Sequence, residues 1–105
     1  MAYDEALAER VRELLAGESG VSERAMFGGL AFMLDGNMAL GIRGGELMVR
    51  VGPDAIEDAL AQPHVRQSYM GERPMKGIVL VAPEAGLGDW VRRGVAHART
   101  LPPKR

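Results

Sequence analysis

Apolar residues near the N-terminus recur every three or four positions, which is the spacing of an amphipathic helix. The spacing predicts a helix over Tyr3–Ala16, with charged side chains on its opposite face and Gly17 as its C-terminal cap. From Arg24 to Leu34 the chain is apolar apart from its first residue, and the turn signal Asp35-Gly36-Asn37 follows. We therefore expect one long strand over residues 24–34 that enters a hairpin.

A period-two alternation, typical of strands with two different faces, continues after this turn. Residues 38–42 and 46–51 follow the alternation, and Gly44-Gly45 forms a tight turn between them. The outward side of the second of these strands carries Met48 and Arg50. The pattern predicts a three-strand antiparallel meander with one face open to solvent or to a partner.

The second half of the chain contains two helices that begin at or after a proline. The first is expected over residues 53–62, and an irregular stretch with a short strand at residues 68–70 follows. Residues 75–81 are almost entirely apolar and predict a well-covered strand. The last helix begins after Pro83, and Gly94 on its apolar stripe indicates close packing against the sheet.

The predicted elements run in the order helix, three strands, helix, two strands, helix, within a single domain of residues 1–105. Strands and helices segregated in this way are typical of an α+β fold. We expect a two-layer domain, α-β(3)-α-β(2)-α, in which the helices pack on an antiparallel sheet.

The composition supports a packed domain. Hydrophobic residues make up 47% of the chain, but only 5% of it is aromatic, so the core is expected to be aliphatic. Seven methionines either fill gaps in this core, the favoured interpretation, or form an adaptable contact surface. The absence of cysteine excludes disulfides and thiolate chemistry. Since the chain opens without a signal-peptide pattern and has no membrane-spanning apolar run, we expect a cytoplasmic protein.

Charge is distributed unevenly. The chain carries a net charge of −1, whereas its last fifteen residues hold five basic and no acidic side chains. Such a tail either contacts nucleic acid or complements the negative end of a helix, and the second interpretation is favoured because few charges neutralise few phosphates. The basic residues are Arg92, Arg93, Arg99, Lys104 and Arg105.

Two glycines interrupt the first predicted strand, in the segment Met26, Phe27, Gly28 and Gly29. The segment lacks the lysine and hydroxyl of a phosphate-binding loop, the GxGxxG of a dinucleotide site and the GxSxG of a nucleophile elbow. Glycine within a strand marks a bend, a bulge or a close approach of backbones. We expect a bend or bulge within one strand at Gly28-Gly29.

The sequence shows no recognisable catalytic constellation. His64 and His97 lie in different predicted elements without a partner at metal-ligand spacing, and neither the acids nor the serines form a catalytic pattern. We therefore predict no catalytic, metal-binding or cofactor-binding residues. Arg50 and Lys76 interrupt apolar strands, and each is either a solvated side chain or part of an anion or partner site.

Four short motifs occur in order along the chain: Arg24–Gly29, Asp35-Gly36-Asn37, Leu47–Val51 and Arg73–Gly77. In this combination the chain resembles the N-terminal domain of the TfoX/Sxy family of bacterial competence regulators over nearly its whole length. The resemblance implies the α-β(3)-α-β(2)-α fold and no catalytic residues. It also implies a role in transcription, because the regulators of this family promote DNA-uptake genes together with the cyclic-AMP receptor protein. Those regulators carry a second, C-terminal domain, and we expect this chain to be a stand-alone first domain.

Three functions remain open from the sequence. The leading hypothesis is a small regulatory or protein-interaction module, related to transcription or competence, with transcription machinery as a candidate partner. The second is a nucleic-acid-binding module that uses the basic C-terminal helix and tail, with Arg92, Arg93, Arg99, Lys104 and Arg105. The third is a small-anion-binding protein or enzyme that uses Arg50 and Lys76. A homodimer formed through exposed strand edges is a further alternative.

Overall fold

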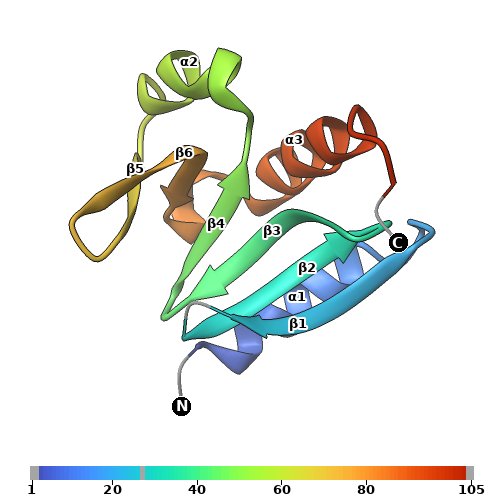
Figure 1. Ribbon diagram of the computed structural model, residues 1–105. Coiled ribbons are helices and arrows are strands. Elements are labelled where there is room, and N and C mark those ends of the chain that lie inside the picture. The colour runs from blue at the N-terminus through green and yellow to red at the C-terminus, as the bar shows by residue number, and fades with distance from the viewer. Residues whose placement is uncertain (1–2, 27, 104–105) are drawn as a thin grey trace.

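The computed structural model describes residues 3–26 and 28–103, and in this part of the chain three α-helices accompany one six-stranded sheet (Figure 1). The predicted α+β class, with helices packed on an antiparallel sheet, is confirmed. The elements run in the order α1 (Glu5–Leu14), β1 (Val21–Met26), β2 (Gly29–Leu34), β3 (Asn37–Arg43), β4 (Glu46–Arg50), η1 (Pro53–Ala55), α2 (Ile56–Leu60), β5 (Val65–Met70), β6 (Arg73–Val81), η2 (Pro83–Ala85) and α3 (Leu87–Arg99).

The strands lie in the order β1-β2-β3-β4-β6-β5, and every neighbouring pair is antiparallel. Apolar side chains from all three helices share one hydrophobic core with the strands. In the view of Figure 1, α1 lies behind the strands. The largest fully buried side chains of this core include Phe32, Leu34, Leu40, Ile42 and Leu47.

The prediction of one long strand over residues 24–34 is wrong, because the chain forms a hairpin where a bend within one strand was expected. β1 and β2 pair with each other from Met26↔Gly29 to Val21↔Leu34. Gly28 has φ +71°, a left-handed value that suits glycine in a turn, and it reverses the chain. Four strands therefore precede α2, where three were predicted. Phe27 of the motif lies outside the described residues.

The close approach of backbones that a glycine pair can mark is present at Gly29. A Cβ atom at this position would lie 2.0 Å from the carbonyl oxygen of Ile42 in β3. The same kind of approach, expected at Gly94 in α3, is confirmed, since a Cβ there would lie 2.8 Å from the carbonyl oxygen of Ala39. Both glycines let two elements pack more closely than any other residue would.

The hairpin predicted from Asp35-Gly36-Asn37 is confirmed, with its turn at Asp35-Gly36. Both residues have positive φ, 50° and 84°, as a two-residue type I′ turn requires. In the second half, β5 begins at Val65 and β6 at Arg73, so both strands are longer than predicted. Their pairing with each other, which the local pattern does not show, extends them.

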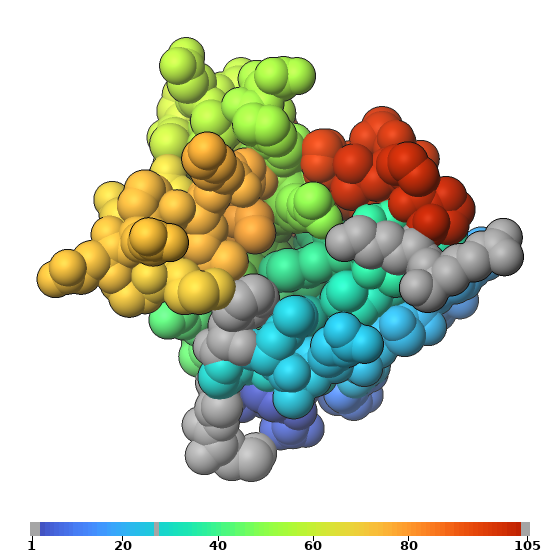
Figure 2. Space-filling view, in the orientation of Figure 1, coloured from blue at the N-terminus to red at the C-terminus, as the bar shows by residue number. Residues whose placement is uncertain are grey.

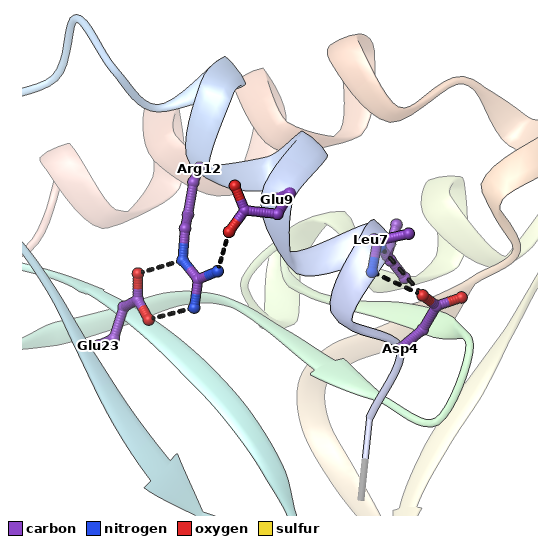
Figure 3. Close-up of polar contacts among 6 residues, drawn as sticks. Asp4, Leu7, Glu9, Arg12 and Glu23 are labelled. Carbon is purple, nitrogen blue, oxygen red and sulfur yellow. Dashed lines mark hydrogen bonds and ion pairs between the residues drawn. The ribbon is translucent and has the colours of Figure 1, made fainter. Parts of the chain in front are cut away.

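A cap and an ion pair position α1 (Figure 3). The Asp4 side chain accepts hydrogen bonds from the backbone N–H groups of Ala6 and Leu7, at 2.9 and 3.2 Å. Farther along the helix, Arg12 donates through Nε and Nη2 to the two carboxylate oxygens of Glu23, at 2.7 and 2.8 Å. This two-point contact joins α1 to the edge strand β1 and lowers the pKa of Glu23.

Glu23→Gln is expected to lower the thermal midpoint of unfolding at pH 7, because Arg12 loses its charged partner. The Arg12 hydrogen bonds hold the pKa of Glu23 below its ordinary value of 4.5. The native carboxylate therefore stabilises the fold above pH 4.5, and this contribution is lost as the pH falls through the folded-state pKa. Circular dichroism melts at pH 7 and pH 3 should show the difference between wild type and variant shrinking in acid. Glu13→Gln, an exposed change on α1, is the control, and a difference that persists unchanged at pH 3 would contradict the argument.

Candidate interaction surface

The face of the sheet turned away from the helices carries a second apolar cluster, which we call the methionine cluster. It consists of buried residues from four neighbouring strands, with two partly buried methionines packed against them. The favoured interpretation, that methionines fill gaps between packed side chains, is confirmed at these positions. The members are Ala31, Met33, Met38, Met48, Ile78 and Leu80, with Met26 and Met75 beside them.

The prediction that this face is open is wrong at its centre. Met48, expected to point outward to solvent or a partner, is only 1% exposed. The sheet twists along its strand order (Figure 1). Flexible methionine side chains from neighbouring strands pack together in one cluster on this face. The exposed part of this face is therefore its charged rim.

Arginines form this rim. Residues directly opposite each other in antiparallel strands point to the same side of a sheet. Three arginines are paired in this way with Ala31, Ile78 and Leu80 of the methionine cluster, and a fourth lines a cleft with Leu80. The four residues are Arg24, Arg43, Arg50 and Arg66.

One carboxylate lies among these arginines. Glu46 is two residues from Met48 on β4, on the same side of the sheet, and it forms an ion pair with Arg66. The four arginines and Glu46 together carry a net charge of +3, although the whole chain carries −1. We call this surface, with the methionine cluster as its floor, the arginine face.

A cleft of about 390 Å³ opens on the arginine face between the β3–β4 turn and the β5–β6 hairpin. Arg43 and Arg66 line it together with Glu46, Tyr69 and Leu80. The Arg43 Nη1 atom donates a hydrogen bond of 2.6 Å to the backbone carbonyl of Tyr69, which holds the hairpin against β3. Guanidinium groups above an apolar base can bind a carboxylate or phosphate group that carries an apolar substituent.

The β5–β6 hairpin that forms one wall of the cleft projects from the body of the molecule (Figure 2). Two of its large hydrophobic side chains are solvent-exposed, Tyr69 by 48% and Met70 by 50%. The Gln67 amide donates to the backbone carbonyls of Ser68 and Met75, at 2.9 and 3.0 Å, across a register shift in this hairpin. These bonds fix the hairpin in shape while leaving its tip accessible.

The structure places Arg50 and Lys76, the two cations predicted to hold an anion, on the neighbouring strands β4 and β6. Arg50 is half-buried, and its Nη1 atom lies 3.4 Å from the carbonyl oxygen of Met38. Lys76 is exposed on β6, so the alternative of a buried lysine that needs a partner does not apply. A role for either of them in binding stays a prediction.

Arg92 and Arg93, predicted to contact a partner, are both exposed on α3. Arg92 forms an ion pair with Asp89 one helical turn earlier. The guanidinium of Arg93 lies 4.5 Å from the ring centre of Trp90 and 3.7 Å from a carboxylate oxygen of Asp58. Both cations therefore already contact groups of the same chain.

Of the three remaining cations of the predicted basic tail, the structure describes only Arg99. Arg99 lies between two carboxylates, at 3.0 Å from Glu18 and 3.1 Å from Asp35. These contacts join the end of α3 to the segment before β1 and to the β2–β3 turn. Lys104 and Arg105 lie outside the described residues.

The two histidines occupy structural positions. The His97 ring packs on Gly52, where a Cβ atom would lie 2.5 Å from its Cε1 atom. Burial and the positive charge of Arg50 lower the pKa of His97. His64 is exposed and has φ +65° in the loop before β5. Residues 3–26 and 28–103 contain no group of three or more histidine or acidic side chains that could hold a metal ion, and none of their helices is long and apolar enough to cross a membrane.

Sequence reasoning missed Arg43, Arg66 and Tyr69. Arg43 follows an alternating strand, and extending that alternation by one residue places it outward, so a signal was present. Arg66 lies in the stretch predicted to be irregular, where no face could be assigned. Its position beside Glu46 depends on β6 lying between β4 and β5, which only the sheet order reveals.

Comparison with known proteins adds one finding. A family model described as the TfoX N-terminal domain matches residues 13–98. Comparisons with curated proteins and with solved structures give no significant match. The matched range begins within α1 and ends within α3, so it includes the whole sheet and the arginine face.

Proposed function

Because the chain belongs to the TfoX N-terminal domain family, we propose that it is a regulatory domain that acts by binding another protein in the cytoplasm. The process we propose is the control of competence genes, and the partner we propose is a component of the transcription machinery. The family match over residues 13–98 is the observation that carries this proposal.

The surface chemistry supports a binding role. The arginine face combines four arginines with the exposed Tyr69 of the cleft, and the methionine cluster forms its floor. Arginine, tyrosine and methionine are enriched at protein–protein interfaces relative to the rest of a protein surface. This composition favours a protein partner as the ligand of the domain.

A tagged form of the full chain, recovered from a native lysate of its host, tests the proposal. Proteins that co-purify are identified by mass spectrometry, and an untagged lysate and an unrelated tagged domain of similar size serve as controls. Enrichment of RNA polymerase subunits or of a transcription factor supports the proposed function. Recovery of nothing above the controls contradicts it.

The second candidate from the sequence, nucleic-acid binding through α3, is less well supported by the contacts of that helix. Arg92, Arg93 and Arg99 each contact a carboxylate of the same chain, and this reduces the charge that they can offer to phosphates. Gel-shift titration with duplex DNA at low salt distinguishes the two functions. DNA binding that weakens steeply with salt, together with an empty pull-down, would favour the nucleic-acid role.

A further inference from the structure

We propose that the arginine face binds an acidic, amphipathic segment of a partner protein. Carboxylates of the segment contact the arginines, and one large apolar side chain of the segment enters the cleft beside Tyr69. This inference rests on the proposed function and adds to it the chemistry of the partner and the location of the site.

Charge complementarity determines the sign of the charge that the partner segment carries. The five charged residues of the face sum to +3 on a chain with a net charge of −1, so positive potential is concentrated there. The guanidinium group is planar and pairs with carboxylates at two points, as Arg12 already does with Glu23 in this molecule. An acidic segment is therefore favoured over a basic or neutral one.

The distance between the charged side chains of the arginine face sets the length of the segment that can contact all of them. Arg43 and Glu46 are paired at one end of the β3–β4 hairpin, and Arg50 lies four residues beyond Glu46 on β4. At the usual rise of a strand, Glu46 and Arg50 are about 13 Å apart. Carboxylates separated by about nine residues of helix, or about four residues of extended chain, would reach both ends.

The cleft supplies an anchor for the apolar side chain. Its volume of about 390 Å³ exceeds that of a single large side chain, and Leu80 of the methionine cluster lies at its base. Leu80 is paired with Met48 of β4, and the flexible, polarizable side chain of Met48 can adjust when a side chain enters the cleft. Tyr69, exposed by 48%, loses exposure when the anchor is seated.

The same features disfavour nucleic acid at this face. Glu46 lies among the arginines and would repel a phosphate backbone that passes over the cleft. An entering peptide carboxylate can compete with Glu46 for the guanidinium of Arg66. A peptide can avoid Glu46 by placing its acidic groups selectively, whereas a phosphate backbone carries a charge at every nucleotide.

Peptide selection tests the proposal without knowledge of the native partner. The random library displays peptides of about 12 residues, which is long enough for a helix to span the face. The bait is the full chain, and selected sequences are resynthesised and titrated by fluorescence anisotropy. We expect enrichment of peptides that combine aspartate or glutamate with at least one aromatic or large aliphatic residue. ¹⁵N chemical-shift changes on binding should include Arg43, Glu46 and Tyr69.

Matched variants localise the binding. The double variant Arg43→Ala/Arg66→Ala should weaken the selected peptide by at least about tenfold. Arg10→Ala/Arg92→Ala, which removes two exposed arginines of α1 and α3, should leave the affinity within about twofold. Arg24→Glu reverses a charge on β1 outside the cleft and should weaken binding without altering the hairpin, so the test does not depend on the double variant alone. Thermal melts confirm that each variant is folded.

Three results would overturn the proposal. The first is that no acidic peptides are found among the selected sequences. The second is that the α1/α3 control variant loses as much affinity for the peptide as the double variant does. The third is that duplex DNA displaces the selected peptide more effectively than a free acidic peptide does. If the pull-down recovers a transcription protein whose binding the double variant does not weaken, the proposed function stands and the assignment of the arginine face fails.

Discussion

Gly94→Val is expected to reduce the free energy of unfolding by about 3 kcal/mol, because it forces α3 away from the sheet. A Cβ atom at Gly94 would lie 2.6 Å from Leu40 Cδ2 and 2.8 Å from the carbonyl oxygen of Ala39. The leucine side chain can move, but the carbonyl belongs to β3 at the centre of the sheet and cannot move without breaking strand pairing. The two methyl groups of valine add to this overlap.

Urea unfolding followed by circular dichroism measures the effect. Gly88→Ala in the same helix is the control, because the nearest atom to its Cβ would be Arg92 Nη1 at an ordinary 3.6 Å. We expect this control to be neutral or to stabilise the protein by up to about 1 kcal/mol, since alanine has the higher helix propensity. Equal destabilisation by both substitutions would show that helix propensity, and not contact with the sheet, decides the result.

Gly29→Ala is expected to have a comparable effect, about 3 kcal/mol, by separating β2 from β3. The added Cβ would meet backbone atoms of Ile42, the oxygen at 2.0 Å and the carbonyl carbon at 3.1 Å. Because both are backbone atoms of the neighbouring strand, no change of side-chain rotamer relieves the clash. Amide hydrogen exchange should show reduced protection along β2 and β3 before other strands are affected.

Substitutions at two further glycines distinguish the effect of a close backbone approach from the effect of a left-handed backbone in a turn. Gly28→Ala introduces a side chain at φ +71° into open space, so it should cost only about 1–2 kcal/mol, the strain of a left-handed backbone. Gly45→Ala places a methyl group where no atom lies within 4 Å, and it should change stability little. If Gly29→Ala were milder than Gly28→Ala, the tight contact with Ile42 would be disproved.

Local sequence signals predicted those parts of the fold that local chemistry determines. Asp35-Gly36 is a turn because both residues tolerate positive φ, and Gly94 stands out because a glycine has no local reason to lie on the buried stripe of a helix. The hairpin at Gly28 was missed because Phe27 is not a typical turn residue, so an unbroken apolar run was interpreted as one strand. The turn is determined by the pairing of β1 with β2, which depends on contacts between residues distant in sequence.

The candidate surface was predictable only in part, for a similar reason. The alternation along β4 placed Arg50 and Met48 on one side, and both lie there. That Met48 is nevertheless buried follows from the twist of the sheet and from methionines contributed by β2 and β3. Arg66 joins Glu46 across β6, which lies between their strands although it follows both of them in sequence. A single sequence shows which face a residue occupies along its strand, but not which distant strands curve over it.

The edge strand β1 has a consequence for self-association. If β1 paired with β1 of a second copy about a two-fold axis, residues of the same side would lie opposite each other. The two registers with the longest overlap would then set Glu23 against Glu23 or Arg24 against Arg24 of the second copy, and like charges directly opposite destabilise such pairing. We therefore expect the charge order of β1 to disfavour its pairing with β1 of a second copy.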